Sequence, residues 1–197
     1  MHEETFVDMT FDCLCKIKHV VEYWSTYVDN DISLDTIYLD FAKAFDKVPH
    51  KRLRKKLSAY GIRGNILSWV TDFLSYRRQQ VAVKGEKSDW ENVISGVPQG
   101  SVLGPILFII YINDLPDVVN NITKIFADDT KIYAPTAKSD VIQGDLNALY
   151  TWSDLWDMKF NVDKCKTMHY GRDNPNHFYT MNDTELQEVN EEKDLGI

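Results

Sequence analysis

The sequence predicts an α+β domain in which helices and antiparallel hairpins pack in layers around one core. Segments with helical spacing of apolar residues alternate along the chain with short β-branched and aromatic runs that end at turns. The 197 residues, 44% hydrophobic and 12% aromatic, are enough for one substantial core. No internal repeat, low-complexity tract or linker divides them, so a single domain is expected.

The first elements follow from apolar spacing. Apolar side chains at helical intervals predict a helix over residues 11–28. The β-branched and aromatic run 36–41 predicts a short buried strand that ends beside Asp40. Pro49 then marks a break, and two further helices are expected over residues 50–59 and 63–75.

The middle of the chain predicts hairpins around one apolar helix. A strand pair is expected from residues 79–83 and 90–94, around a turn at 84–87. Residues 96–100 form a glycine-containing loop before an apolar helix over residues 104–115, which Pro116 stops. Its longest apolar run is far shorter than the roughly 20 residues that a membrane helix requires, so no membrane partner is expected.

The last part predicts a hairpin and a long helix. Strands are expected over 122–126 and 131–133, joined by the connection 127–130. Residues 138–157 predict an amphipathic helix, and the chain alternates toward strands from Phe160 onward. The side chains expected on the buried side of this helix are Val141, Leu146, Leu149, Trp152 and Trp156.

Charge and cysteine content limit the classes of function that the chain can have. The net charge of −8 is the wrong sign for a protein whose main task is to hold a phosphate backbone. The basic run 51–56 favours a solvated helix face over a phosphate contact. Cys13, Cys15 and Cys165 cannot form paired bridges, and the N-terminus lacks the basic region of a signal peptide. We therefore expect reduced thiols in a nuclear or cytoplasmic protein that is not secreted.

Asp40, Asp128 and Asp129 are the candidate reactive residues. Asp40 follows an apolar strand, and Asp128 and Asp129 are adjacent acids at the tip of a hairpin. A tight turn favours Asp, so the pair is also explained by a polar turn. If the three carboxylates converge, they offer the oxygen ligands that Mg²⁺ prefers. Spacing alone leaves both interpretations open.

Five segments resemble the ordered motifs of a known family, the reverse transcriptases of non-LTR retrotransposons of the LINE type, jockey- and CR1-like. Each segment is similar to one motif, and the order A to E is that of the family. The segments are YLDFAKAFDKVPH at 38–50 (motif A), SGVPQGSVLGP at 95–105 (motif B), FADD at 126–129 (motif C), FNVDKCK at 160–166 (motif D) and KDLG at 193–196 (the start of motif E).

The resemblance implies a fold and a reaction. The fold would be the palm of a right-hand polymerase, with an antiparallel sheet that carries the acids and packs on helices. Asp40, Asp128 and Asp129 would bind two Mg²⁺ or Mn²⁺ ions, about 3.5–4 Å apart. The chain would transfer a nucleotide from a dNTP to a DNA primer 3′-hydroxyl on an RNA template.

The resemblance also implies roles at the substrate. Phe45 would be a steric gate against the ribose 2′-hydroxyl, although a core aromatic behind the strand is also consistent. Gln99 would lie beside the incoming nucleotide, with Gly96 and Gly100 allowing close backbone approach. Lys164 would protonate the departing pyrophosphate, with Lys166 or an exposed lysine without a role as alternatives.

Three polar residues beside these motifs have a more ordinary expected role. Lys43 and Asp46 are interpreted as a structural ion pair within motif A, and His50 as a residue that lies on the surface or packs at a helix start.

The motifs divide the chain into seven expected parts. These are a remnant before motif A at 1–35, motif A at 36–50, a helical and hairpin insertion at 51–94, motif B at 95–116, motif C at 122–134, motif D at 138–170 and the start of motif E at 171–197. Most of the family's fingers and its thumb would then belong to a longer polyprotein, which would account for the acidic charge. The alternative function is an inert retrotransposon-derived remnant, or a module that binds nucleic acid or protein.

Overall fold

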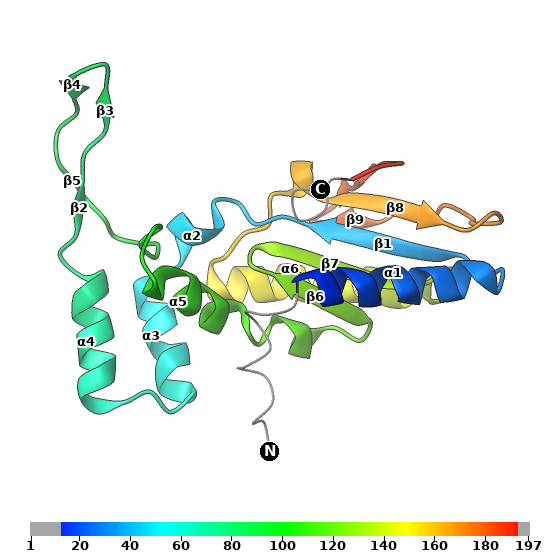
Figure 1. The fold of residues 1–197 in the computed structure, drawn as a ribbon, viewed down its shortest axis with the longest axis horizontal. Coiled ribbons are helices and arrows are strands. Elements are labelled where there is room, and N and C mark those ends of the chain that lie inside the picture. Colours follow the sequence, from blue (N-terminus) through cyan, green and yellow to red (C-terminus); the bar gives the residue numbers. More distant parts are fainter. Residues whose placement is uncertain (1–12, 193–197) are drawn as a thin grey trace.

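The structure is a computed structural model that describes residues 13–192, and it contains a five-stranded sheet with helices on both faces (Figure 1). The strand order is β11-β8-β1-β7-β6. The central strand β1 (Leu34–Leu39) pairs antiparallel with β7 (Asp129–Pro135) and β8 (Lys166–Tyr170). Outside them, β6 (Ile122–Phe126) pairs antiparallel with β7, and β11 (Gln187–Glu188) pairs parallel with β8. The predicted α+β class is confirmed.

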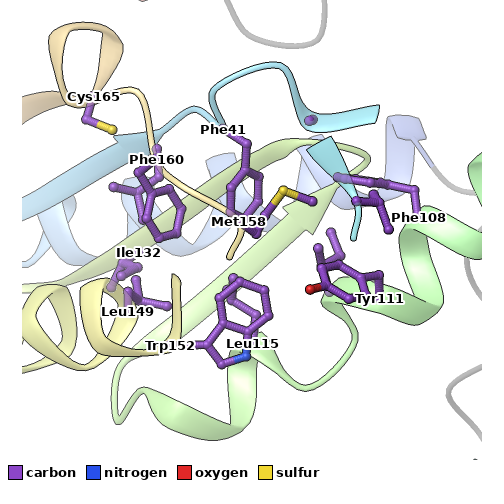
Figure 2. Close-up of a cluster of buried hydrophobic side chains, with 14 of the residues drawn as sticks. Phe41, Phe108, Tyr111, Leu115, Ile132, Leu149, Trp152, Met158, Phe160 and Cys165 are labelled. Atoms are coloured by element: carbon purple, nitrogen blue, oxygen red, sulfur yellow. The ribbon is translucent and has the colours of Figure 1, made fainter. Parts of the chain in front are cut away.

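One face of the sheet packs against helices and forms the main hydrophobic core with them. Ile37 and Leu39 of β1 are buried together with Ile132 of β7, since these positions share one face of the pleated sheet. They belong to one cluster with the buried side chains of α5 (Leu103–Ile112) and α6 (Ser139–Trp156). Figure 2 shows the aromatic part of this cluster, where Phe41 stacks on Phe160 at a ring-centroid distance of 4.5 Å.

The opposite face is partly covered by α1 (Cys13–Asp29). The Trp24 ring contacts Tyr133 and Tyr170, with centroid distances of 6.2 Å and 4.7 Å. Tyr133 and Tyr170 lie toward one end of β7 and β8, and the sheet ends that carry Asp129 and Lys166 are at the other end. The helix therefore lies on the face of the sheet that carries Asp129, away from that residue along the strand.

A second group of elements extends from one end of the sheet. It begins with the short α2 (Ala44–Lys47), followed by α3 (His50–Ala59) and α4 (Gly64–Leu74). A narrow hairpin then projects away from the sheet, as Figure 1 shows at the left. Four two-residue strands form it: β2 (Arg78–Gln79) with β5 (Glu91–Asn92), and β3 (Ala82–Val83) with β4 (Glu86–Lys87).

The remaining elements are short. The 3-10 turns are η1 (Leu115–Val118), η2 (Thr136–Lys138) and η3 (Val162–Lys164), and a small hairpin joins β9 (Thr180–Met181) to β10 (Thr184–Glu185). Within residues 13–192, no helix has both the length and the hydropathy needed to cross a membrane. The segment 193–196, which resembles the start of motif E, lies outside the described residues.

Buried carboxylates hold the strands in place. Asp145 of α6 accepts hydrogen bonds from the backbone and side-chain amides of Asn120 and Asn121, at 2.8–3.0 Å, which fixes the start of β6. Asp35 of β1 is also fully buried. Its carboxylate lies within hydrogen-bond distance of the side chains of His169, Asn174 and Tyr179.

Several expected boundaries were wrong. The helix expected over 104–115 ends at Ile112, because Leu115 and Pro116 fold into a separate 3-10 turn. The connection expected at 127–130 shortens to two residues, since Asp129 and Thr130 pair in the sheet. The turn expected at 84–87 is shorter as well, because Glu86 and Lys87 pair with the preceding strand.

The buried side of α6 differs from the prediction at one position. Leu146, Leu149 and Trp152 are buried as predicted, but Val141 is 38% exposed and Ile142 occupies the core position. The helix begins at Ser139, which places Ile142 four residues before Leu146 on the same face.

Candidate active site

A pocket of about 370 Å³ lies at the end of β1, beside the first residues of β7 and β8. Its lining combines carboxylates, lysines and an aromatic side chain from the three strands, the residues that follow β1, the loop before β8 and the segment after β11. The lining residues are Tyr38, Leu39, Asp40, Asp129, Thr130, Lys131, Lys164, Lys166 and Glu192.

Strand register brings two of the three predicted acids together. Leu39 of β1 is paired with Thr130 of β7, and the residues that adjoin this pair, Asp40 and Asp129, both line the pocket. The hairpin that leads to Asp129 turns at Ala127, whose φ of 52° is unusual for a residue with a side chain.

Asp128 lies in the turn between β6 and β7 and is absent from the lining of this pocket. Over residues 13–192, no group of three or more His, Cys, Asp or Glu side chains has a metal-binding arrangement. The structure therefore brings Asp40 and Asp129 to one pocket, and it does not bring all three acids into a common cluster.

The carboxylate of Asp40 is poorly satisfied. Its side chain is 25% exposed, and Lys164 Nζ lies 3.2 Å from Oδ2. That contact is within ion-pair distance but lacks hydrogen-bond geometry, so Oδ2 is a buried oxygen without a hydrogen-bond partner. The Lys164 ammonium is the cation that compensates this oxygen in the structure. A carboxylate oxygen without a hydrogen-bond donor is also the type of ligand that Mg²⁺ prefers.

The loop that carries Lys164 is attached to the end of β1 by backbone hydrogen bonds. The Asn161 N–H donates to the carbonyl of Asp40 at 2.8 Å, and the Ala42 N–H donates to the carbonyl of Lys159 at 2.8 Å. Lys166, the alternative to Lys164, forms an ion pair with Glu192 at 2.6 Å. Of the two lysines, Lys164 is the one that reaches the candidate acid.

The segments that resemble motifs A and B are joined by several hydrogen bonds. The Val97 N–H donates to the Phe45 carbonyl and the Gly96 N–H to the Val48 carbonyl, both at 2.8 Å. Gly96 has a φ of +86°, and a Cβ there would lie 2.7 Å from the Asp46 carbonyl oxygen. Only glycine fits this contact without movement of the backbone.

Gln99 and Phe45 have partners within the same junction. Gln99 is exposed, and its Nε2 donates to Asp46 Oδ1 at 3.2 Å. Phe45 is half-buried and stacks on Phe108 at a centroid distance of 4.6 Å. Gly100 has a φ of +78° with open space around its Cα, so its role is conformational.

Three contacts in this region were not predicted from the sequence. Asp46, interpreted as half of an ion pair with Lys43, instead bonds Gln99 through its side chain and accepts from Ser95 Oγ at 2.9 Å through its carbonyl. His50 Nε2 lies 2.8 Å from the Gly96 carbonyl oxygen, in addition to its position at the helix start. No periodicity in the sequence signals these contacts, because they depend on how two loops meet.

The structure also corrects the prediction for Lys56. The basic run 51–56 was expected to be a solvated face, but Lys56 is buried, pairs with Asp114 and lies 3.9 Å from the centroid of the Trp156 ring. Burial lowers the pKa of Lys56, and the Asp114 carboxylate opposes that change. Its position three residues after Leu53, on the same helical face, is a sequence signal for this burial.

The comparisons with known proteins agree with these features. A family model described as "Reverse transcriptase (RNA-dependent DNA polymerase)" matches residues 25–194. The chain belongs to the reverse transcriptase family. This family membership agrees with the resemblance expected from the sequence.

The curated relatives of this reverse transcriptase chain are enzymes of mobile elements. It is 31% identical to the "RNA-directed DNA polymerase from mobile element jockey" of Drosophila funebris, over 81% of this chain and 19% of the relative. It is 29% identical to the jockey protein of Drosophila melanogaster, over 79% of this chain and 18% of the relative. It is also 31% identical to the "Probable RNA-directed DNA polymerase from transposon X-element" of Drosophila melanogaster, over 75% of this chain and 17% of the relative. The chain therefore spans less than a fifth of these relatives.

A solved structure shares the fold. The apo telomerase of Candida tropicalis, truncated from its C-terminal domain, matches with a TM-score of 0.61 and 12% identity, over 90% of this chain and 39% of that chain. At this identity the match supports the fold alone. It agrees with a mixed sheet-and-helix architecture like that of a polymerase palm.

Proposed function

We propose that this chain carries the reaction site of an RNA-directed DNA polymerase, which adds a nucleotide from a dNTP to a DNA primer 3′-hydroxyl on an RNA template. The observation that supports this most is the meeting of Asp40 and Asp129 at one pocket, in a chain of the reverse transcriptase family. The RNA template, the primer and the dNTP are its proposed partners. Companion fingers and thumb regions would come from a longer polyprotein in the nucleus or cytoplasm.

Asp40 and Asp129, which line one pocket, and Asp128 in the adjacent turn are the proposed ligands of two Mg²⁺ or Mn²⁺ ions. The donor set suits these ions because carboxylate oxygens are the ligands that they prefer. The buried Oδ2 of Asp40, which lacks a hydrogen-bond donor, supports the assignment further. When bound, such ions supply charge neutralisation to the attacking and leaving oxygens of an in-line phosphoryl displacement.

Lys164 is the proposed general acid. Its side chain is 67% exposed and its Nζ lies 3.2 Å from Asp40 Oδ2, so it holds a proton beside the reaction site. A lysine in this position can transfer that proton to the oxygen of the leaving pyrophosphate. The proposal assigns no role in chemistry to Lys166, whose partner is Glu192.

The junction of motifs A and B is the proposed site of the incoming nucleotide. The stack on Phe108 holds the ring of Phe45 in one orientation, as a steric gate against a 2′-hydroxyl requires. Gln99 is exposed and is positioned by Asp46. Gly96 brings the loop backbone close to motif A, and Gly100 is exposed with open space where a side chain would stand.

Primer extension on an RNA template tests the proposed function. The 197-residue chain is assayed alone and joined to the flanking regions of a curated relative, since it spans less than a fifth of those proteins. We expect the joined protein to extend the primer with dNTPs, and its Asp40→Asn variant to lose that activity. Extension by the Asp40→Asn protein at the original rate would contradict the proposed reaction site.

A further inference from the structure

A second pocket, of about 630 Å³, lies away from the candidate active site and shares none of its lining residues. It is lined by the end of α2, the start of α3, the end of α4, the segment after β5 that returns from the projecting hairpin, and the residue after α6. The lining residues are Lys47, Pro49, His50, Lys51, Arg54, Thr71, Ser75, Ile94, Ser95 and Asp157. Its volume falls in the range of about 300–1,000 Å³ that is usual for ligand sites.

The charge of this pocket is strongly positive. Lys47, Lys51 and Arg54 are exposed, and none of them forms an ion pair with an acid in residues 13–192. The acid in the lining, Asp157, lies 3.0 Å from Arg52 and is compensated by it. In a chain of net charge −8, three uncompensated cations around one pocket indicate attraction for an anion.

The start of α3 adds to this attraction. Pro49 is the N-cap residue, it provides no side-chain cap, and the first turn contains no acid. By ordinary helix geometry the first N–H groups, such as those of Lys51 and Arg52, have no acceptor within the helix. Exposed N–H groups and the positive end of the helix dipole both favour an anion at this position.

The hydroxyl groups of the pocket already donate hydrogen bonds within the protein. Thr71 Oγ1, Ser75 Oγ and Ser95 Oγ already donate to the backbone carbonyls of Leu67, Thr71 and Asp46, at 2.7–2.9 Å. The free donors are therefore the three cations and the helix amides. A group with several charged oxygens, such as a phosphate, uses this set more fully than a single carboxylate does.

We propose that this pocket binds a phosphate group, supplied by a polynucleotide strand or by a free phosphate compound. The pocket is a binding site apart from the reaction, and it goes beyond the proposed polymerase function. Only the choice of a strand as one source rests on that function. Ser95 lines this pocket and is the first residue of motif B. An anion bound here would therefore contact the residue next to Gly96, where motifs A and B meet.

The test is a binding assay in EDTA, so that a metal site cannot contribute. The probes are a fluorescently labelled single-stranded RNA and, separately, pyrophosphate measured by calorimetry. The Lys51→Ala/Arg54→Ala variant is compared with Lys55→Ala/Lys87→Ala, which removes the same charge at exposed positions outside the pocket. Thermal melting of each variant checks that it is folded.

We expect the pocket variant to weaken binding of one of the probes about tenfold, and the control variant to change it less than about threefold. If RNA is the ligand, the salt dependence of its affinity also falls, by about 0.7 in the logarithmic slope per lost contact. RNA binding alone identifies a strand as the source, and pyrophosphate binding alone identifies a free phosphate compound.

Absence of binding for both probes, or an equal loss in the two double variants, would overturn the proposal. The primer-extension assay of the Asp40→Asn protein tests the polymerase assignment, and that substitution changes none of the residues of this pocket. A failure of the polymerase assignment is therefore distinguishable from a failure of the phosphate site.

Discussion

Lys164 Nζ lies 3.2 Å from Asp40 Oδ2, which joins the loop before β8 to the end of the central strand. The two residues are the proposed general acid and the proposed metal ligand of one reaction. In the structure the lysine occupies space beside the buried oxygen that the metal proposal requires. Lys164 and a metal ion would therefore compete for Asp40, and this competition can be measured.

Replacement of Lys164 tests that competition. Lys164→Met removes the charge, and we expect Mn²⁺ to bind about 1.4- to fivefold more tightly, because an exposed ion pair contributes about 0.2–1 kcal/mol. Lys138→Met, on a 3-10 turn outside the pocket, is the control and should leave the affinity unchanged. Calorimetric titration measures both, and an unchanged or weaker affinity in Lys164→Met would show that the lysine does not oppose the ion.

The contact between Gly96 and Asp46 predicts a stability difference between two glycines. Gly96→Ala introduces a Cβ 2.7 Å from the Asp46 carbonyl oxygen, whereas Gly85→Ala, at a similar φ of +92°, meets no atom within 4 Å. We expect Gly85→Ala to lower the free energy of unfolding by about 1–2 kcal/mol. Gly96→Ala should cost at least about 2 kcal/mol more. Urea denaturation measures the difference, and equal losses would indicate that the junction of motifs A and B can open at low cost.

Phe45 can be tested for its two interpretations at once. Phe45→Val shortens the side chain that stacks on Phe108, and we expect a loss of about 1–2 kcal/mol in the free energy of unfolding. If the ring is also the steric gate, the same variant of the joined protein should incorporate ribonucleotides more readily. Competition between dNTP and rNTP in primer extension measures this selectivity. A destabilised variant with unchanged selectivity would leave Phe45 as a core aromatic only.

Cys165 predicts a pH-dependent reactivity. The thiol is fully buried, and burial raises its pKa to about 11. The neutral thiol is favoured in the folded chain, so its contribution to stability is complete below the unfolded pKa, near 8.5. That contribution is lost as the pH rises toward the folded value.

In a Cys13→Ser/Cys15→Ser chain, the remaining thiol is Cys165. We expect it to resist iodoacetamide at pH 8.5 in buffer and to react in 8 M urea. Mass spectrometry measures the modification. Rapid labelling of the folded chain would contradict the burial of this side chain.

The elements of the fold that depend on local spacing were predictable from the sequence. The helices α1, α3, α4 and α6 and the strand β1 lie within two residues of their expected bounds at each end. The projecting hairpin was predicted as a pair of strands but pairs at fewer positions, because its residues are exposed on both faces and have little core to pack against.

The contacts between loops were not predictable. The meeting of Asp40 and Asp129 required the register of β1 and β7, which spacing along the chain does not specify. The roles of Asp46 and His50 at Gly96 depend on a backbone approach between two loops. The resemblance to a family identified Asp40, Gln99 and the glycines as a group, and the structure supplied their partners.

Metal binding by the three acids is the central claim, and a melting experiment with Mn²⁺ tests it most directly. At a hundredfold excess over Kd, ligand binding adds about 2.7 kcal/mol, which corresponds to a rise in Tm on the order of 5–10 °C for a chain of this size. We expect this rise in the unaltered chain and in the control Asp89→Asn, which lies on the projecting hairpin. Asp40→Asn and Asp128→Asn should abolish it. An equal rise in all four proteins would contradict the assignment of Asp40 and its neighbours as the metal site.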